Sequence, residues 1–386
     1  MLRQSLRSFL EKEAKPNHEQ WEKDRMVSRE IWQKAGEMGF LNIDMPIEYG
    51  GGGLDASFSM LIAEEVARSG FSGLGFSLHS DIVAPYILKY GSEEQKQKFL
   101  GKMATGEWIA CIGMTEPGAG SDLKSLQTTA KDMGDHYLVN GSKTFITNGY
   151  MSDFVLLACR TNPGTAKEGI SLILVESDRK GYSKGNPFKK LGMKSNDTCE
   201  LFFEDVEVPK SNLLGTEGAG FRLMMTELAR ERLSVAVGAI GGAEAALEAT
   251  IQYVQERRAF KQMIAGFQNT QFKLAECATT LQIHQSYVDT CVATFIDKKL
   301  SPEQASMAKY SATDMHCKIV DECVQLHGGY GYMWEYFVTQ NYADSRVARI
   351  YAGTNEIMKL LIARGLLPIH FAELKQLKKA KAAELA

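Results

Sequence analysis

The sequence lacks several features that mark particular classes of protein. None of its seven cysteines belongs to a Cys-x-x-Cys pair, so neither a zinc ribbon nor a disulfide framework is supported, and we expect no metal centre. The sequence also lacks an excess of charge of one sign. The 44 Lys and Arg face 47 Asp and Glu, and the net charge of −3 does not predict a nucleic-acid-binding surface. The cysteines are expected to be small packing residues in a reducing compartment.

Long hydrophobic runs are absent as well. No stretch approaches the roughly 18 consecutive apolar residues that a membrane-spanning helix needs, so we predict no transmembrane segment. Residues 1–10 contain the Arg and Ser typical of a transit peptide, but Glu11 and Glu13 follow directly and the apolar residues keep a helical spacing. We therefore expect no targeting segment in this chain and assign its first residues to the first helix of the fold.

The sequence does contain enough apolar residues for a large core. Hydrophobic residues make up 44% and charged residues 24% of 386 residues, a composition typical of a globular protein of two or three domains. Residues 1–110 show mainly helical patterns, with a capping box formed by Ser92 and Gln95. Residues 216–386 are helical again. They contain a second capping box at Ser301 and Gln304, and small residues between 236 and 243 that predict a closely packed, buried helix.

Residues 111–215 have a different pattern, with short β-rich runs broken by turn residues. Among them, Asn140-Gly141 lies between two runs of strand-forming residues and suits the positive φ angles of a type I′ turn. We therefore predict a hairpin at this dipeptide. The predicted fold class is α+β, mainly α, with a helical N-terminal domain (1–110), a central β domain (111–215) and a C-terminal helical domain (216–386).

The most informative peptide lies at the start of the β region, Met114-Thr-Glu-Pro-Gly-Ala-Gly-Ser-Asp122. Gly118 and Gly120 permit a tight turn in which backbone N–H groups converge, and Thr115 and Ser121 add hydroxyl groups. This combination suits a cofactor with many hydrogen-bond acceptors. An ordinary Pro-Gly turn explains the same residues, so their chemistry alone leaves both interpretations open.

This nonapeptide resembles the flavin-contacting signature of the acyl-CoA dehydrogenase family. Four more segments are similar to motifs of that family and follow in its order and spacing: Lys143-Thr-Phe-Ile-Thr-Asn-Gly149, Gln255-Glu-Arg-Arg-Ala-Phe260, Gln325-Leu-His-Gly-Gly329 and Ile350-Tyr-Ala-Gly-Thr-Asn-Glu356. Together the five segments span nearly the whole chain. The resemblance implies a helical N-terminal domain, a central β-barrel-like domain and a C-terminal four-helix bundle that bind FAD where they meet. It also implies a homotetramer or a homodimer.

The same resemblance implies which residues contact FAD. Around the isoalloxazine ring and the pyrophosphate it points to Ile112, Met114, Thr115, Gly120, Ser121, Phe145, Ile146 and Thr147. For the adenylate, held across a subunit contact, it points to Arg257, Phe260, Gln268, Gln325, Gly328 and Gly329. Thr354, Asn355 and Glu356 match another flavin-contacting turn. For Arg257 a second interpretation stays open, an exposed helix charge paired with Glu256 or Glu276.

The reaction that this family performs needs a carboxylate. A base takes the α-proton of an acyl thioester while the flavin accepts the β-hydrogen as a hydride. In many members the base is a Glu after the Tyr of the Ile-Tyr-x-Gly-Thr motif, but here Ala352 has that position. In a subset that includes the long-chain and isovaleryl enzymes, the base precedes an Arg on a helix of the C-terminal domain, and Glu231-Arg232 matches that pair. We therefore predict Glu231 as the base; the alternative is a solvated helix charge with Glu227 as its i,i+4 neighbour.

Substrate contacts are implied in the same way. Ser121 is expected to lie near the acyl-CoA, and Arg232 to position and electrostatically support the site. Tyr351, Ala352 and Gly353 are expected to touch the substrate. The backbone N–H of Ala352 would polarise the thioester carbonyl, a role that survives loss of the Glu side chain. Burial is expected to raise the pKa of the base toward neutrality.

The function that the resemblance implies is FAD-dependent α,β-dehydrogenation of medium-to-long-chain or branched acyl-CoA thioesters to trans-2-enoyl-CoA. Electron transfer flavoprotein is the implied electron acceptor. The similarity is greatest to the long-chain enzymes, although Arg222 follows Phe221 where the long-chain pattern has an aromatic pair. The alternatives are an acyl-CoA oxidase, and a catalytically silent paralogue that binds acyl-CoA and FAD. The expected setting is a bacterial cytoplasm or a mitochondrial matrix.

Overall fold

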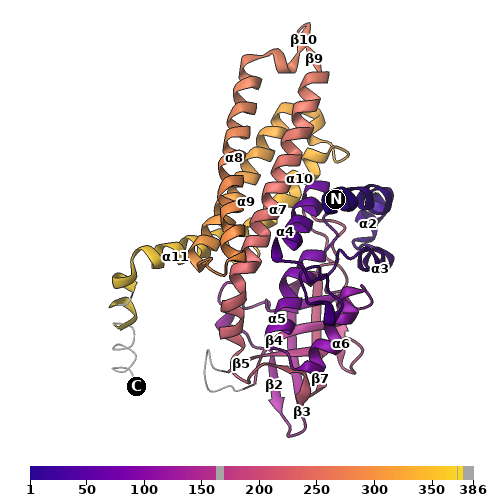
Figure 1. The fold of residues 1–386 in the computed structure, drawn as a ribbon, viewed down its shortest axis with the longest axis vertical. Helices are drawn as coiled ribbons and strands as arrows, with labels where there is room; N and C mark the ends of the chain where they lie inside the picture. Colours follow the sequence, from indigo (N-terminus) through magenta and orange to yellow (C-terminus); the bar gives the residue numbers. More distant parts are fainter. Residues whose placement is uncertain (162–168, 372, 377–386) are drawn as a thin grey trace.

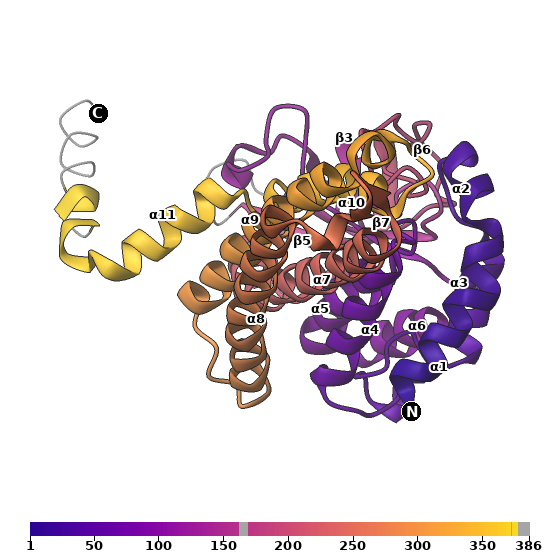
Figure 2. The same cartoon turned by 90° about the horizontal axis from the view of Figure 1, so that it is seen from above.

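The computed structural model describes residues 1–161, 169–371 and 373–376. Its elements form a helical part, then a sheet, then a second helical part, which confirms the predicted fold class. The sheet lies at the lower end of the molecule in Figure 1, the long C-terminal helices stand above it, and the N-terminal helices pack beside both. Seen from above, helix α11 (Asn355–Leu366) projects away from the rest of the molecule (Figure 2).

The N-terminal part begins with a helix, as the sequence predicts, and residues 1–10 are not set apart from the fold. The capping box before α6 is present: the backbone N–H of Gln95 donates to Ser92 Oγ at 3.2 Å, and that of Ser92 donates to Gln95 Oε1 at 3.0 Å. The elements of this part are α1 (Leu2–Phe9), η1 (Leu10–Ala14), η2 (Lys15–Asn17), α2 (His18–Asp24), α3 (Arg29–Glu37), η3 (Ile47–Tyr49), α4 (Ala56–Ser69), η4 (Leu78–Val83), α5 (Ala84–Tyr90) and α6 (Glu93–Ala104).

The central part is one eight-stranded sheet that folds over on itself. Its order is β6-β7-β3-β2-β4-β5-β8, and β1 pairs in parallel with β4. Inward side chains of β3 and β7 pack against those of β4 and β5, while the other face of β4 and β5 packs against α5 and α6. The strands are β1 (Ala110–Gly113), β2 (Thr129–Asp132), β3 (His136–Ile146), β4 (Phe154–Arg160), β5 (Ile170–Glu176), β6 (Tyr182–Lys184), β7 (Cys199–Pro209) and β8 (Leu213–Leu214).

The hairpin predicted at Asn140-Gly141 is wrong. Strand β3 continues through this dipeptide, and the chain instead turns between β2 and β3 at residues 133–135. The dipeptide forms a bulge against β7, where the Asn140 amide and the Asp205 backbone and carboxylate exchange two hydrogen bonds of 2.9 Å. Gly141 has φ +142°, and a Cβ there would lie 2.6 Å from Thr128 Oγ1. The conformational freedom of Gly therefore serves a bulge at a close contact rather than a turn.

The C-terminal part is built around α7 (Gly220–Glu256), which packs against α4, α8 and α9. The small residues of α7 allow a close approach, because a Cβ on Gly241 would lie 2.4 Å from the carbonyl oxygen of Glu64. Among the described helices, α7 alone is long and apolar enough to cross a membrane, yet 61% of its most apolar window is buried inside the protein, as in a core helix. The other elements are β9 (Arg258–Ala259), β10 (Gln262–Met263), η7 (Ile264–Gly266), α8 (Gln268–Ile296), α9 (Pro302–His327), η8 (Gly328–Tyr332), α10 (Phe337–Ser345) and η9 (Arg346–Arg349).

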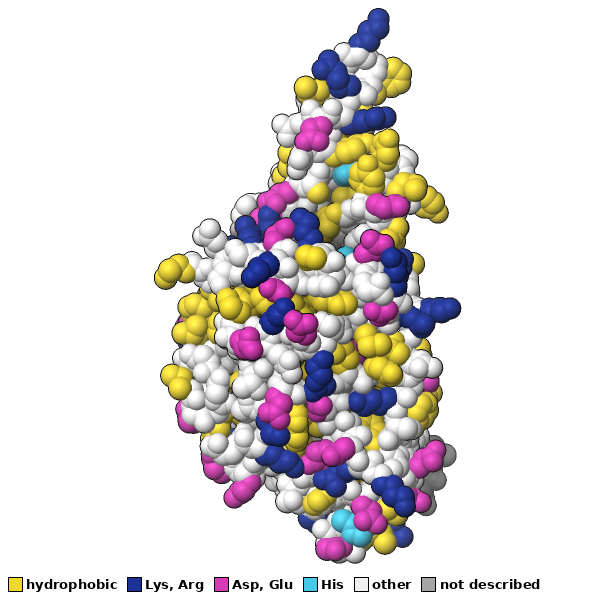
Figure 3. Space-filling model, turned by 90° about the vertical axis from the view of Figure 1, so that its right-hand side faces the viewer, with side chains coloured by type: hydrophobic (Ala, Val, Ile, Leu, Met, Phe, Trp, Pro, Cys, Tyr) yellow, Lys and Arg dark blue, Asp and Glu magenta, His cyan; other side chains and the backbone are white. Residues whose placement is uncertain are grey.

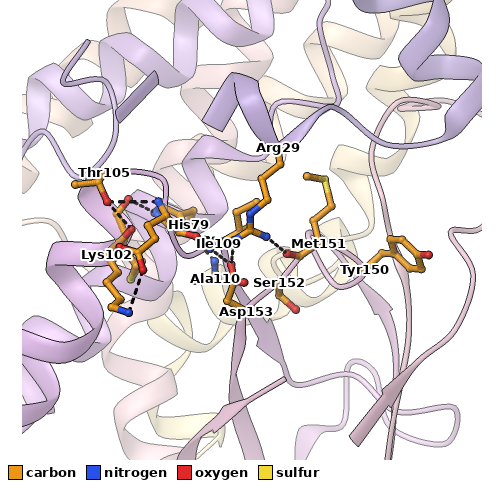
Figure 4. Close-up of polar contacts among 12 residues, drawn as sticks. Arg29, His79, Lys102, Thr105, Ile109, Ala110, Tyr150, Met151, Ser152 and Asp153 are labelled. Carbon is orange, nitrogen blue, oxygen red and sulfur yellow. Dashed lines mark hydrogen bonds and ion pairs between the residues drawn. The ribbon is translucent and has the colours of Figure 1, made fainter. Parts of the chain in front are cut away.

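A polar network joins the N-terminal part to the start of β1 (Figure 4). The Asp153 carboxylate accepts a hydrogen bond from the backbone N–H of Ile109 at 2.7 Å and forms an ion pair with Arg29. His79 is fully buried, and burial lowers the pKa of its imidazole to about 4. The ring is therefore neutral: Nδ1 accepts from the backbone N–H of Ala110 at 3.1 Å, and Nε2 lies 3.0 Å from the Met103 carbonyl. These contacts hold the strand that leads into the Met114–Asp122 peptide.

Candidate active site

A cavity of about 820 Å³ lies where the three parts of the fold meet. Helices α4, α7 and α11 and the sheet contribute to its walls. Its lining includes residues from distant parts of the sequence that were predicted to form one site: Ile112, Met114, Thr115, Gly120, Ser121, Phe145, Ile146, Thr147, Glu231, Arg232, Tyr351, Ala352 and Gly353.

The sheet wall of the cavity is fixed by a buried ion pair. Lys143 Nζ lies 2.7 Å from Glu116 Oε1 and donates a second hydrogen bond to the carbonyl of Met114 at 3.2 Å. Glu116 also accepts a hydrogen bond from the backbone N–H of Thr128 at 2.9 Å. These contacts within the protein hold the turn after β1 in place. Thr115, Gly120 and Ser121 of this turn line the cavity.

Free hydrogen-bonding groups and an aromatic ring face the cavity from this wall. The hydroxyls of Thr115, Ser121 and Thr147 line it and form no hydrogen bond with any described residue. Phe145 has φ +58°, which is unusual for a residue with a bulky side chain. Its side chain is 68% exposed and lies 5.6 Å from the ring of Phe188. Such a surface can hold a ligand that is both aromatic and rich in polar atoms.

The Glu231 carboxylate belongs to the helical wall of the cavity, on the cavity face of α7. That face recurs at helical spacing through Leu228, Glu231, Val235 and Gly238. Glu231 is only 5% exposed, and its Oε1 accepts a hydrogen bond of 3.0 Å from the hydroxyl of Tyr86. Burial raises the pKa of Glu231 to about 7, against the opposing effects of the Tyr86 hydrogen bond and the Arg232 charge. This carboxylate can therefore take up a proton near neutral pH.

Arg232 brings an unpaired positive charge to the same cavity. Its side chain is buried, burial lowers the pKa of its guanidinium, and its Nε has no hydrogen-bond partner among the described residues. A buried cation without a partner is costly, and a bound ligand that offers oxygen atoms would remove this cost. The alternative for Glu231, a solvated helix charge, does not fit these surroundings, because Glu231 and its neighbours Glu227 and Arg232 are all buried.

The turn at residues 351–353 closes the cavity from the side of α11. Ala352 has φ +53° and Gly353 has φ +86°, so both adopt the left-handed conformation. The carbonyl of Gly353 accepts a hydrogen bond of 2.8 Å from Nζ of Lys309, a residue of α9 that is fully buried. Burial lowers the pKa of Lys309 to about 8, and the Arg232 charge adds to the effect. The turn is thus held from behind by a strong donor.

The three residues after this turn have partners within the protein. Thr354 Oγ1 accepts the backbone N–H of Ile357 at 3.3 Å and caps α11. Asn355 is buried and hydrogen-bonded to Thr313 and Lys309, both at 3.0 Å. Glu356 is exposed. These residues do not line the described cavity, and their predicted contact with a flavin stays a prediction.

The residues predicted to hold the adenylate lie at the other end of the bundle. They are exposed residues on the segments that connect or end α7, α8 and α9: Arg257, Phe260, Gln268, Gln325, Gly328 and Gly329. Arg257 forms no ion pair among the described residues, and its guanidinium lies 5.5 Å from the ring of Tyr330. From residue 231 to residue 257 the helix rises about 39 Å, at 1.5 Å per residue. This end of the bundle carries β9 and β10, lies at the top of Figure 1 and is called the tip below. The tip is therefore remote from the cavity of the same chain.

The sequence prediction also lacks two residues that support the site from outside the cavity lining. Tyr86 and Lys309 each contact a predicted residue from behind, and no motif contains them. The i,i+4 spacing of Tyr86 and Tyr90 matches that of Glu231 and Glu227, to which they donate. The match between these two spacings can be recognised only in the tertiary structure, where α5 packs against α7.

The chain matches known proteins along nearly its whole length. Models of the N-terminal, middle and C-terminal domains of acyl-CoA dehydrogenases match residues 1–107, 111–206 and 218–367. The chain is 49% identical to the mitochondrial long-chain specific acyl-CoA dehydrogenase of Mus musculus over 366 residues, which cover 94% of this chain and 85% of that protein.

Solved structures agree with this match. An acyl-CoA dehydrogenase from Geobacillus kaustophilus superposes with a TM-score of 0.93 at 48% identity, covering 95% of this chain and 97% of that chain. A glutaryl-CoA dehydrogenase from Mycobacterium smegmatis in complex with FADH2 superposes with a TM-score of 0.89 at 30% identity, covering 95% of this chain and 93% of that chain. The chain therefore belongs to the acyl-CoA dehydrogenase family, the flavoprotein oxidoreductases of fatty acid metabolism.

Proposed function

We propose that this acyl-CoA dehydrogenase uses Glu231 as the base that removes the α-proton of its substrate. The observation that carries the proposal is the position of this carboxylate in the shared cavity, buried and with its pKa raised to about 7. It faces the same space as Thr115, Thr147 and Ala352, which belong to the motifs for flavin and thioester. Ala352 cannot itself accept a proton, so another group must do so.

The proposed reaction forms a double bond between the α- and β-carbons of an acyl thioester. The Glu231 carboxylate takes the α-proton, and the electron pair of that C–H bond moves into the new double bond. A bound FAD would supply the acceptor for the β-hydrogen, which leaves with its electron pair as a hydride. The backbone N–H of Ala352 polarises the thioester carbonyl while negative charge develops there, and Lys309 keeps this turn in place through the Gly353 carbonyl.

The residues present fit an FAD. Three hydroxyls without partners in the described chain, those of Thr115, Ser121 and Thr147, suit the polar edge of a flavin and its phosphates. The exposed Phe145 ring offers a flat apolar surface next to them. Buried Asn196 also lines the cavity, and its Nδ2 has no hydrogen-bond partner among the described residues. We propose that these residues hold the isoalloxazine end of the cofactor.

A second copy of the chain would complete the cofactor site. The tip residues Arg257 and Gln325 lie too far from the cavity of their own chain for one dinucleotide to reach both, whereas the tip of a partner can approach it. Apolar surface supports such an assembly: Phe260 is 90% and Tyr332 is 88% exposed, and Leu366, the last residue of α11, is also exposed. Helix α11 itself projects from the rest of the molecule (Figure 2). Figure 3 shows a patch of hydrophobic side chains on the upper, helical part of the molecule, and further patches lower on the same face. We propose a homotetramer or a homodimer.

The acyl chain is proposed to run between α4 and α7. Beyond Glu231 the cavity is walled by Ala63 and Ala67 of α4 and by Val235 and Gly238 of α7, which are apolar and mostly small. Room of this kind suits medium-to-long-chain or branched acyl groups. We propose electron transfer flavoprotein as the electron acceptor, and a bacterial cytoplasm or a mitochondrial matrix as the setting.

The test compares Glu231→Gln with Glu227→Gln in the FAD-loaded enzyme. Glu227 is buried one turn earlier on the same helix and does not line the cavity, so it is a matched control. Straight and branched acyl-CoA thioesters are added without oxygen, and bleaching of the flavin is followed. We expect the wild type and Glu227→Gln to bleach, and Glu231→Gln to lose at least a hundredfold in rate. Absence of bleaching in the wild type with every thioester would support the silent paralogue instead, and rapid reoxidation of the reduced wild type by oxygen would support an oxidase.

A further inference from the structure

The Glu231 carboxylate has one hydrogen bond within the described residues, and it comes from Tyr86. The phenol oxygen lies 3.0 Å from Oε1 of Glu231. Tyr86 belongs to α5, a helix of the N-terminal part, and its side chain is 0% exposed. The contact therefore crosses from one domain to another in a fully buried place, where a hydrogen bond to a charged group is strong.

Tyr86 does not line the cavity, whereas Glu231 does. The phenol thus contacts the carboxylate from the side away from the ligand space. Only one of the two carboxylate oxygens is used by this contact, and the other has no protein partner among the described residues. A carboxylate fixed through one oxygen keeps the second available to the α-carbon of a thioester.

Apart from Arg232, the charged and titratable groups around this carboxylate have other partners. Those on the elements packed around it are Glu227, Arg230 and Arg232 on α7, Tyr86, Lys89 and Tyr90 on α5, Asp81 on η4 and Lys309 on α9. Lys89 and Tyr90 both bind Glu227, at 2.6 Å. Arg230 binds Asp81 at 3.0 Å, and Lys309 binds the carbonyl of Gly353. Apart from the nearby Arg232 charge, Tyr86 is thus the group that favours the ionised form of Glu231.

We infer that Tyr86 is a positioning residue for the catalytic base, which orients the Glu231 carboxylate toward the α-carbon and stabilises its ionised form. This inference rests on the proposed function. Donation by the phenol lowers the pKa of Glu231 and opposes the larger effect of burial. The pKa of Tyr86 itself is raised far above its usual value by burial, so the phenol keeps its proton throughout the working range. Without this donor the base would be protonated at neutral pH and largely inactive.

The test is the pH dependence of kcat/KM for Tyr86→Phe, measured on the FAD-loaded full-length enzyme. Phe keeps the ring and removes only the donor. We expect the midpoint of the acidic limb to move upward by roughly one pH unit, with activity below the midpoint reduced about tenfold and activity on the alkaline plateau within about threefold of wild type. A residue that only fills space would lower the activity, the FAD content or the melting temperature without moving this midpoint.

The matched control is Tyr90→Phe, which removes the equivalent donor to Glu227 one turn along both helices. Its midpoint should stay within about 0.3 pH units of wild type. If Tyr86→Phe does not fold, site-specific 3-fluorotyrosine at position 86, a stronger donor of the same shape, should move the midpoint downward. An unmoved midpoint in the folded Phe variant, or in the fluorinated enzyme, overturns the inference. If Glu231→Gln keeps wild-type activity, the proposed base itself is wrong, whereas an inactive Glu231→Gln with an unmoved Tyr86→Phe profile removes only the role of Tyr86.

Discussion

The Nζ of Lys309 lies 2.8 Å from the carbonyl oxygen of Gly353, and this contact joins the centre of the bundle to the turn that would polarise the thioester. Both residues of the turn, Ala352 and Gly353, have left-handed backbone conformations, which for Ala costs about 1 kcal/mol. A buried cationic donor can hold such a turn. We therefore expect the direction of the Ala352 N–H to depend on Lys309, a residue outside every sequence motif.

Lys309→Met should accordingly lower kcat/KM by about tenfold or more, because a hydrogen bond from a charged group to a buried carbonyl is worth ~1.5–3 kcal/mol. Steady-state kinetics with one good acyl-CoA substrate measure this. Lys318→Met, on the exposed side of the same helix, is the control and should behave as wild type. Equal activity of the two variants would show that the turn does not need Lys309.

Replacement of the base should change stability as well as activity. Burial raises the pKa of Glu231 from 4.5 to about 7, so the folded state binds this proton more tightly than the unfolded state. The resulting stabilisation is complete below about pH 4.5 and is lost as the pH rises through about 7. Near pH 8 the folded wild type holds a buried carboxylate at a cost of up to about 3 kcal/mol.

Glu231→Gln should therefore melt at a higher temperature than wild type near pH 8, by a few degrees, with a smaller difference near pH 5. Thermal denaturation of the FAD-loaded enzymes without substrate measures both values. A difference that is the same at the two pH values would contradict a raised pKa for this group.

The length of acyl chain that the enzyme accepts should depend on Gly238. A Cβ at this position would meet only the Cβ of Ala67, at 3.6 Å, so a methyl group is tolerated there. The longer side chain of Gly238→Leu would enter the space between α4 and α7. We expect its kcat/KM for palmitoyl-CoA to fall at least tenfold relative to that for butyryl-CoA, while Gly238→Ala keeps the wild-type ratio. An unchanged ratio in the Leu variant would place the acyl chain elsewhere.

The tip of the bundle should contribute to FAD binding in a partner subunit. A guanidinium fork matches a phosphate, and Arg257 forms no ion pair among the described residues that would occupy it. Arg257→Ala should retain several-fold less FAD after gel filtration, at the same oligomeric mass by light scattering. The neighbouring exposed Arg258 is the control. Equal FAD content in Arg257→Ala and Arg258→Ala would argue against this role.

The sequence was sufficient to predict the order of the three parts and the motif residues that line the cavity, because both depend on local patterns and motifs. The capping boxes at Ser92 and Ser301 are examples of signals that act within one turn of helix. Ile112, Met114, Thr115 and residues 145–147, although distant in sequence from Glu231, meet it in one cavity.

The remaining features depend on contacts between elements, which no local pattern encodes. The Asn140-Gly141 dipeptide has the composition of a turn, but pairing with β7 makes it a bulge. Tyr86 and Lys309 look like ordinary helix residues in the sequence, and only the packing of α5 and α9 brings them behind the cavity. Asn355 belongs to a motif, yet its amide is held by α9. Residues that support a site in this way can be identified only in the tertiary structure.

The most direct test of the central claim measures proton removal separately from hydride transfer. An acyl-CoA analogue with sulfur in place of its β-carbon has no β-hydrogen to lose, so in D₂O the enzyme can only exchange the α-hydrogens, which mass spectrometry detects. If Glu231 is the base, the wild type and Glu227→Gln exchange rapidly, and Glu231→Gln exchanges at least a hundredfold more slowly while it binds the analogue with similar affinity. Exchange by Glu231→Gln within about threefold of the wild-type rate would contradict the account.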